Sequence, residues 1–531
     1  MNIYTISFLI LLIFNIIKNQ KSLHILQQNL YNENNRYLKW LKKNTKYIFL
    51  SLEIVSVILI AISCYIDNGI TNFLIILALI SYILEALRLI SLKKNSKIKK
   101  PLVITKRIKR LLVTMSAIYI IPIIFYLVDY QNGNIVLLLF SVMTYLSYFI
   151  VWLAKVINTP IEKCVYFYFE NRAKAKLKEM SKLKVIGITG SYGKTSSKNI
   201  LNDILSIKYI TKPTPKNLNT EYGLMITINN YLEKFDEIFI AEMGAYKKGE
   251  IKTLCDMVHP QYGILTTIGV AHLESFGSHE NIVKTKFELI ESLTKDGVAI
   301  LNGDDPKQLS YHIKSDCKKI WIGIQNKEVD IYAEDIEYSH KGSKFKVVFT
   351  DNQKKYAFET KLLGSYNIYN ILASIALGKE LGMSISDLQV GVKKVKPIES
   401  RLELRNYGYM YQINDAYNSN PVGAKMALEV LDMMPGIKVV VTPGMTELGE
   451  KEQELNNIFG TQISKVADYV ILVGEKRTKP IFKGIIESGY DKEKVYVVNN
   501  VYDAYTLLQQ FREKQVIYAL FENDLPDIYN E

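Results

Sequence analysis

The first third of the chain contains long apolar runs that few folds can accommodate. Five such runs occur, near Ile3–Ile17, Tyr47–Ile66, Ile70–Ile90, Leu111–Val128 and Ile135–Ile157. A helix needs about 20 apolar residues to cross a bilayer, and the last four runs approach or exceed that length while the first is marginal. We therefore expect an α-helical transmembrane bundle of about five spans over residues 1–158. Buried helices of a soluble domain are the alternative interpretation.

The charges between these runs alternate in a way that soluble helices do not require. Residues 18–46 contain seven Lys and Arg and one acidic residue, and residues 93–110 contain nine Lys and Arg and no acidic residue. The turns at 67–69 and 129–134 carry no Lys or Arg. Because basic loops stay on the cytoplasmic side, five spans place the N-terminus outside and everything after Ile157 inside. We expect a multi-pass protein of the cytoplasmic membrane with the rest of the chain, residues 159–531, in the cytoplasm.

The net positive charge belongs to this first third alone. Residues 1–182 hold 24 Lys and Arg against 8 Asp and Glu, whereas residues 183–531 hold 42 against 45. A nearly neutral second part argues against nucleic-acid binding. Within the apolar runs, Glu85 and Arg88 stand three apart and are expected to pair, while Glu53 is a candidate functional charge. The charged segment 159–182 is expected to be a helical connector. The four cysteines are too far apart in sequence to suggest structural zinc.

A glycine-rich loop opens the second part of the chain. Val185–Ser197 reads VIGITGSYGKTSS, and Asn199–Leu205 after it is compatible with a helix. A strand, a glycine loop and a helix together direct backbone N–H groups and a helix N-terminus at a phosphate. Lys194 is expected to reach the β- and γ-phosphates, and the Thr195 hydroxyl to bind Mg²⁺. A plain glycine-rich turn is the alternative, because Ile188 stands where the strict pattern has its first glycine.

This loop and the blocks after it resemble the Mur ligase superfamily. In chain order the blocks are GITGSYGKTS (Gly187–Ser196), KNLNTEYG (Lys216–Gly223), IAEMGAYKKGEI (Ile240–Ile251), TTIGVAHLESFGSHENIVKTKFELI (Thr266–Ile290), LNGDDP (Leu301–Pro306), LLGSYNIYNILASIAL (Leu362–Leu377), ESRLE (Glu399–Glu403) and NDAYNSNPVGAKMAL (Asn414–Leu428). DAYNSNP together with AHLESFGS is similar to the MurF-like branch, which adds D-alanyl-D-alanine. The resemblance implies a P-loop Mur ligase central domain at 183–397 and a Rossmann-like C-terminal domain at 398–531. Apolar runs alternating with helix-like segments after Glu399 agree with the second assignment.

The resemblance implies ATP-dependent amide formation, in which a substrate carboxylate takes the γ-phosphate and an amine then captures the acyl phosphate. It implies catalytic roles for Lys194, Lys286, His272 and Arg401. It implies nucleotide contacts from Gly190, Ser191, Gly193, Lys194, Thr195, Ser196, Asn302, Arg401 and Asp415. The expected Mg²⁺ ligands are Thr195, Glu242 and His272, and the expected substrate contacts are Asn217, Asn219, Thr220, Asn418 and Asn420. Lys286 matches a lysine that is carbamylated in several members of the family.

The chain departs from the family pattern in three places. Apolar runs and a connector stand where MurF-like enzymes have a soluble domain that binds the UDP part of the substrate. Tyr366 replaces a frequent histidine, and the chain ends ALFENDLPDIYNE instead of with the usual lysine-glycine-serine motif. The expected partners are therefore a small-molecule or lipid-linked peptidoglycan precursor, an amino acid or dipeptide, and cell-wall synthesis proteins. A ligase for a polyglutamate-like acceptor and an ATP-driven transporter are the alternative functions.

Overall fold

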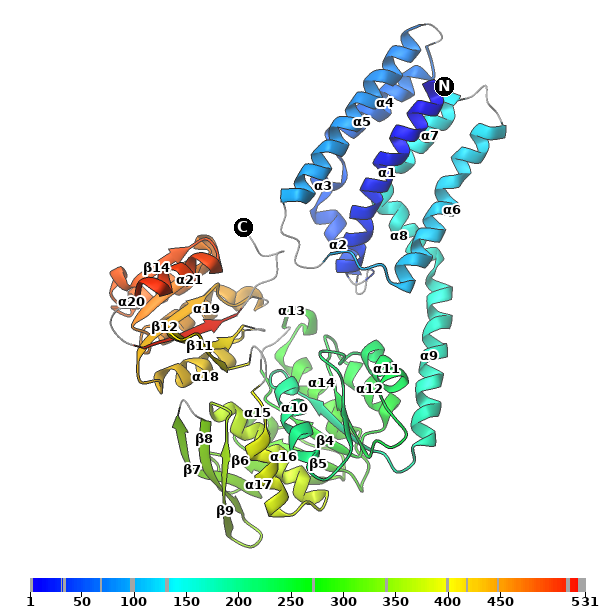
Figure 1. Cartoon of the computed structure of the whole chain (residues 1–531). Coiled ribbons are helices and arrows are strands. Elements are labelled where there is room, and N and C mark those ends of the chain that lie inside the picture. Colours follow the sequence, from blue (N-terminus) through cyan, green and yellow to red (C-terminus); the bar gives the residue numbers. More distant parts are fainter. Residues whose placement is uncertain are drawn as a thin grey trace. The chain divides into compact units, whose positions relative to one another are not determined.

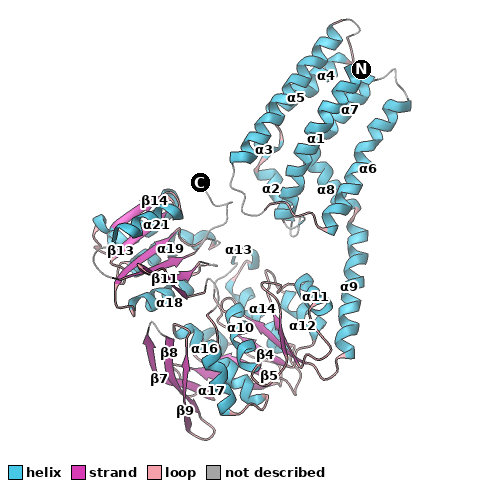
Figure 2. Ribbon diagram, viewed as in Figure 1, coloured by secondary structure: helices cyan, strands magenta, loops and turns pink. Residues whose placement is uncertain are grey.

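The computed structural model describes residues 3–29, 31, 35–66, 69–95, 101–128, 133–269, 273–339, 342–397, 401–416, 419–446, 448–511 and 516–523. The chain divides into two compact units, Met1–Tyr168 and Phe169–Glu531. In the described part, the first unit contains only helices, whereas the second combines helices with strands (Figures 1 and 2). This is the helical region followed by an α/β region that the sequence predicts.

The helices of the first unit pack into a bundle with an apolar outer surface and a partly polar interior. They are α1 (Ile3–Gln28), α2 (Arg36–Lys43), α3 (Thr45–Ile48), α4 (Ser51–Ser63), α5 (Ile70–Asn95), α6 (Lys106–Val128), α7 (Gly133–Tyr145) and α8 (Ser147–Ile157), followed by α9 (Thr159–Glu179), which contains the boundary between the units. Large apolar side chains such as Ile16, Phe73 and Phe125 are exposed, while Asn15 and Ser141 are buried. Soluble domains rarely expose so many large apolar side chains.

Three of these helices, α1, α5 and α6, are long and apolar enough to cross a membrane. The helices α7 and α8 pass the same test together, but a bend of 79° separates them. The run Tyr47–Ile66 differs from the expected single span, because Phe49 and Leu50 adopt extended backbone and divide it into α3 and the 13-residue α4. The described residues therefore contain three candidate spans, or four if the bent pair counts as one.

The helix α1 is longer than its apolar run because its polar residues face the interior of the bundle. The Lys18 ammonium donates to the Glu53 carboxylate at 2.6 Å and to the Tyr145 carbonyl oxygen at 3.0 Å, and both charged side chains are almost completely buried. Tyr145 is the last residue of α7, so this lysine binds a carbonyl group at the break before α8. The expected pair of Glu85 and Arg88 also forms, at 3.4 Å.

The second unit begins with a nine-stranded sheet that is mostly parallel. Its order is β2-β3-β1-β4-β5-β6-β7-β8-β9, and only the pairs β7–β8 and β8–β9 are antiparallel. The strands are β1 (Lys184–Thr189), β2 (Thr211–Pro213), β3 (Ile238–Glu242), β4 (Tyr262–Leu265), β5 (Val298–Asn302), β6 (Lys318–Gly323), β7 (Ile331–Ser339), β8 (Gly342–Phe349) and β9 (Lys354–Thr360). The helices are α10 (Lys194–Leu205), α11 (Glu221–Asn230), α12 (Glu250–Val258), α13 (Leu273–Phe276), α14 (His279–Glu291), α15 (Pro306–Leu309), α16 (Ser365–Glu380) and α17 (Ile385–Lys394).

The residues of β1 show how the two faces of this sheet are covered. Ile186 and Ile188 belong to the core shared with α10, α16 and α17. Gly187 lies between them, and a Cβ atom there would come within 2.6 Å of Leu289 on α14. The missing side chain thus lets α14 pack closely against the opposite face of β1.

A second, six-stranded sheet has the order β10-β11-β15-β12-β13-β14, in which only β10 and β11 are antiparallel. Its strands are β10 (Glu403–Asn406), β11 (Met410–Asp415), β12 (Ile437–Thr442), β13 (Tyr469–Val473), β14 (Val495–Val498) and β15 (Ile517–Glu522). The helices α18 (Pro421–Asp432), α19 (Glu452–Ile463) and α20 (Glu475–Glu487) share one core with it, and α21 (Val501–Gln510) shares the other. Short 3₁₀ turns occur at Gly449–Lys451 and Lys492–Lys494.

Candidate active site

The phosphate loop lies where β1 ends and α10 begins. Gly193 is the residue directly before α10 and has a φ of 86°, a left-handed conformation that favours glycine. A Cβ atom at this position would also collide with the hydroxyl group of Tyr366. The loop is held to the neighbouring segment after β4, because the Ser191 N–H donates to the Thr267 carbonyl oxygen at 2.9 Å. The sequence-predicted strand, glycine loop and helix are therefore present.

Lys194 is the first residue of α10 and turns back over its own loop. Its ammonium group donates to the carbonyl oxygens of Gly190 and Ser191, at 2.8 and 3.2 Å. Desolvation in the pocket lowers the pKa of Lys194 to about 8, against the opposing effect of Glu242 and with a smaller contribution from Arg401. An anion bound at the loop would raise this pKa again, because it would stabilise the charged ammonium.

Glu242 is the last residue of β3, and its carboxylate contacts three side chains from neighbouring segments. Its Oε1 accepts hydrogen bonds from the Thr195 hydroxyl at 3.1 Å and the Asn219 amide at 2.9 Å. Its Oε2 lies 3.0 Å from the Lys198 ammonium. The carboxylate and the hydroxyl are hard oxygen donors of the kind that Mg²⁺ prefers, so Thr195 and Glu242 fit this cation. Among the described residues, no group of three or more His, Cys, Asp or Glu forms a metal cage.

Lys286 enters the pocket from α14, which Gly187 allows to approach β1. Its side chain is 3% exposed, and its ammonium lies 5.7 Å from the centre of the Phe276 ring. Burial lowers the pKa of Lys286 well below its ordinary value, and the nearby Lys194 lowers it further. A larger fraction of this amine is therefore neutral than of an exposed lysine at the same pH.

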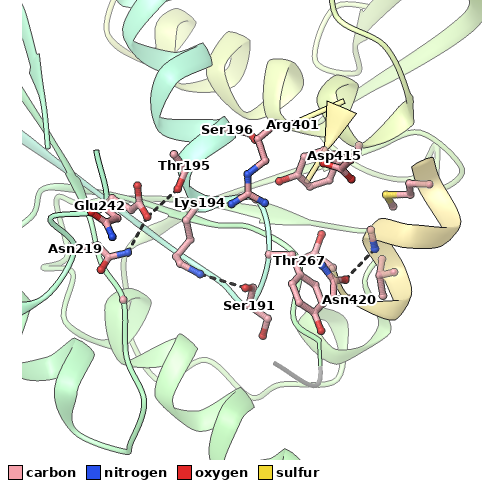
Figure 3. A pocket seen from close by; sticks show the side chains of 18 of the residues that line it. Ser191, Lys194, Thr195, Ser196, Asn219, Glu242, Thr267, Arg401, Asp415 and Asn420 are labelled. Carbon is pink, nitrogen blue, oxygen red and sulfur yellow. Dashed lines mark hydrogen bonds between the residues drawn. The ribbon is translucent and has the colours of Figure 1, made fainter. Parts of the chain in front are cut away.

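The six-stranded sheet adds residues from the end of β11 and from the segments beside it. Desolvation raises the pKa of Asp415 to about 6, although Arg401 and a hydrogen bond from the Leu402 N–H oppose the increase. Asn420 caps α18, where its Oδ1 accepts the Gly423 N–H at 2.9 Å. Figure 3 shows Glu242 and Asn219 on one side of Lys194, with Arg401, Asp415 and Asn420 on the other.

One pocket therefore collects residues from both sheets of the second unit. Among the residues that line it are the predicted Ser191, Gly193, Lys194, Thr195, Ser196, Asn217, Asn219, Glu242, Lys286, Arg401, Asp415 and Asn420. Positive charge from Lys194 and Arg401 lies beside hydroxyl and carboxylate oxygens in this pocket, which suits a polyphosphate accompanied by a divalent cation.

Comparison with known proteins decides the family. Residues 188–378 match the model of the Mur ligase middle domain, and residues 400–520 match that of the Mur ligase glutamate ligase domain. A Bacillus subtilis relative, UDP-N-acetylmuramoyl-tripeptide–D-alanyl-D-alanine ligase, is 33% identical over 59% of this chain and 69% of its own length. This chain belongs to the Mur ligase family. It is therefore an ATP-dependent ligase that joins a carboxylate to an amine.

Two further comparisons describe the extent of the likeness. The Escherichia coli enzyme of the same name is 31% identical over 55% of this Mur ligase and 65% of the relative. The crystal structure of Thermotoga maritima MurF ligase in complex with ADP superposes with a TM-score of 0.61 and 27% identity, covering 68% of this chain and 81% of the other. This Mur ligase thus spans about two thirds of the length of the B. subtilis and E. coli relatives.

Some predicted residues of this Mur ligase do not reach the pocket. Thr220 instead caps α11, with its hydroxyl 3.4 Å from the Gly223 N–H. Asn302 accepts the Asp304 N–H at 2.9 Å and is not among the pocket-lining residues. Gly190 contributes its carbonyl oxygen to Lys194 without lining the pocket itself. The predicted His272 and Asn418 lie outside the described residues.

Sequence reasoning also missed residues that the structure brings to the site. Lys198 was overlooked although it stands one helical turn after Lys194, where both side chains share a face of α10. Tyr366 was noted only as a departure from the family pattern, yet its hydroxyl lies against the phosphate loop. Glu522 ends β15 and is fully buried beside Asp415, and no local sequence signal marks it.

Proposed function

We propose that this protein is a MurF-type peptide ligase that joins D-alanyl-D-alanine, or a similar amine, to a muramoyl-peptide precursor. The observation that carries the proposal is the single pocket in which Lys194, Thr195 and Glu242 from the first sheet meet Arg401 and Asp415 from the second. The names of the B. subtilis and E. coli relatives supply the substrate class.

ATP is the nucleotide that this pocket suits. The N-terminus of α10, directly after Gly193, directs its N–H groups at a bound phosphate, and the relative from T. maritima was solved with ADP. Thr195 and Glu242 are the residues that would hold Mg²⁺, and His272 is the further ligand expected from the sequence. The cation would neutralise charge on the phosphate oxygens. Lys194 and Arg401 add positive charge where the transferred phosphoryl group becomes most negative.

The reaction proceeds in two balanced steps. A carboxylate oxygen of the precursor forms a bond to the γ-phosphorus, and the bond from that phosphorus to the β–γ bridging oxygen breaks to release ADP. The nitrogen of the incoming amine then bonds to the carbonyl carbon of the acyl phosphate, phosphate leaves, and the amine loses a proton. The residues of the pocket contribute mainly by binding the reactants close together and excluding water.

Three asparagines line the part of the pocket where we place the peptide substrates. Asn217 and Asn219 come from the first domain of the second unit, and Asn420 comes from the domain of the second sheet. Amide groups of this kind donate to carboxylates and accept from amines, so they suit a peptide acceptor and an amino-acid donor. Because Asn219 also binds Glu242, it connects the substrate side to the metal ligand. Asn418 is a further substrate contact proposed from the sequence.

We further propose that the enzyme is tethered in the cytoplasmic membrane by its helical unit. The outward apolar side chains, the buried Lys18–Glu53 pair and the strongly basic segments between the runs support this location. A membrane-bound ligase can act on a lipid-linked precursor as well as on a soluble one, and it can associate with other cell-wall synthesis proteins. A polyglutamate-like acceptor is the alternative for the same chemistry.

The decisive experiment supplies the full-length protein in detergent with ATP, Mg²⁺, a UDP-muramoyl-tripeptide or its lipid-linked form, and either D-alanyl-D-alanine or glutamate. We expect ADP release and amide product only when both acceptor and amine are present. Lys194→Ala should reduce product formation by about 10²-fold or more, whereas Lys178→Ala on the exposed face of α9 should leave it unchanged. Release of ADP that needs neither substrate, or an unaffected Lys194→Ala variant, would reject the proposal.

A further inference from the structure

The last residues of two neighbouring strands place two carboxyl groups side by side behind the pocket. In the parallel pair β11–β15, Asp415 stands opposite Glu522. Residues opposite each other in a parallel pair direct their side chains to the same face of the sheet. Asp415 lines the pocket, whereas the side chain of Glu522 is 0% exposed. Glu522 therefore lies behind the pocket, next to the pocket residue Asp415.

The contacts of Glu522 leave one of its oxygen atoms without a donor. Its Oε1 accepts a hydrogen bond from the Ser419 hydroxyl at 2.6 Å. Its Oε2 is buried and receives no N–H or O–H group from the described residues. The neighbour of this carboxyl is the Asp415 carboxyl, with which it makes a side-chain contact. Ionisation of both carboxyl groups is unfavourable when they are buried side by side, and one proton held between them would satisfy the remaining oxygen.

Few charged groups act on the Asp415–Glu522 pair in the described part of the chain. Of the described groups that act on Glu522, the charged ones are Asp415 on β11 and Arg401 before β10. Neighbouring segments also bring uncharged residues to this end of the sheet: β12 ends at Thr442, and the segment leading into α18 contributes Ser419. Burial raises the pKa of Glu522 well above its ordinary value, and Asp415 raises it further. With one shared proton, the pair carries a single negative charge next to the single positive charge of Arg401.

We propose that Glu522 is a positioning residue for nucleotide binding: its carboxyl group keeps a proton, donates it in a hydrogen bond to Asp415, and thereby holds Asp415 and Arg401 in place for the polyphosphate. The inference rests on the proposed nucleotide site. A second ionised carboxylate would draw the Arg401 guanidinium towards itself and repel the phosphates. Nucleotide binding is therefore linked to one proton, and affinity falls as pH rises through the pKa of the pair.

The test compares nucleotide affinity across pH in the full-length protein in detergent, with ADP and Mg²⁺ as the probe between about pH 7 and pH 9.5. The pKa of Lys194, lowered to about 8, makes some loss of affinity common to every variant. The informative quantity is therefore the ADP affinity of Glu522→Gln divided by the ADP affinity of the unaltered protein at the same pH. The glutamine keeps a donor for Asp415 and an acceptor for Ser419 but cannot ionise. We expect this ratio to increase with pH, by up to about tenfold per pH unit above the pKa of the pair.

Two further variants make the test specific. Glu522→Ala removes the donor, so it should bind ADP more weakly than Glu522→Gln at every pH. Glu359→Gln alters an exposed carboxylate on β9 and should reproduce the unaltered pH profile. Identical pH profiles for Glu522→Gln and the unaltered protein would overturn the inference. If the unaltered protein bound no nucleotide at any pH, the proposed function itself would fail. This result differs from identical pH profiles, so the two failures can be told apart.

Discussion

The ammonium group of Lys198 lies 3.0 Å from the carboxylate of Glu242, and both side chains are almost completely buried. Lys198 also donates to the Lys216 carbonyl oxygen at 2.7 Å, in the block directly before the Asn217 and Asn219 pair. A buried carboxylate keeps its charge only when a cation or several donors compensate it. Lys198 therefore compensates and orients the Glu242 carboxylate, and links it to the substrate side of the pocket.

Replacing Lys198 should weaken the metal site without touching the nucleotide. In Lys198→Met, Glu242 loses the cation that orients its carboxylate, so the Mg²⁺ concentration needed for half-maximal ADP release should rise by about 10–100-fold. Loss of a buried partner should also lower the free energy of unfolding by about 3–5 kcal/mol. The Mg²⁺ titration is the measurement, and Lys178→Met is the surface control. An unchanged Mg²⁺ requirement would show that Lys198 does not act on Glu242.

Lys286 should react with carbon dioxide, because only a neutral amine can form a carbamate. The lowered pKa of Lys286 leaves a larger neutral fraction at neutral pH than an exposed lysine has, and the fraction increases with pH. Ligase activity should therefore depend on bicarbonate and should fall reversibly when the pH is lowered and carbon dioxide is removed. The intact protein should gain the mass of one carbon dioxide at this residue.

Variants separate this chemistry from a structural role for the lysine. Lys286→Ala should lose about 10²-fold or more of the activity, and a small carboxylic acid such as propionate should restore part of it by replacing the carbamate. Lys284→Ala, on the same helix but about half exposed and paired with Glu280, should retain full activity. Restoration by an amine instead of an acid would contradict the carbamate and indicate that a positive charge is required.

The strands of the second unit follow closely from local sequence. The apolar runs Tyr469–Val473 and Val495–Val498 coincide with β13 and β14, because a short apolar run rich in β-branched and aromatic residues is typical of a strand. The phosphate loop and Glu242 were also predictable, since each directly follows such a run and strand ends meet at one edge of a parallel sheet.

What sequence reasoning did not reach depends on the register between distant segments. The role of Glu522 arises only when β15 pairs with β11 and brings it opposite Asp415. The break before α4 was missed for a similar reason, because Phe49 and Leu50 carry no glycine or proline signal and their aromatic contacts come from α7 and α8, where Phe49 packs on Tyr145 and Phe149. Lys18 was read as the first charge of a loop, although Glu53 and the helix break bury it.

The native cysteines offer a direct test of the proposed membrane orientation. Cys64 follows α4 beside the turn expected outside, and Cys164 is exposed on α9, on the side expected inside. The other two, Cys255 and Cys317, are buried in the second unit. In intact cells a membrane-impermeant maleimide should therefore label Cys64, whereas Cys164 should react only after the membrane is permeabilised.

Replacing each cysteine singly by serine shows which residue carries the label. Cys64→Ser should abolish the signal from intact cells, and Cys164→Ser should abolish the increase after permeabilisation. Labelling of Cys164 in intact cells would invert the orientation and place the ligase domains outside, where ATP is not available to them. If Cys64 reacts in neither condition while Cys164 behaves as expected, the short α4 does not reach the outer surface. Its 13 residues span only about 20 Å, so this outcome would replace the expected five crossings by a bundle in which α4 ends within the bilayer.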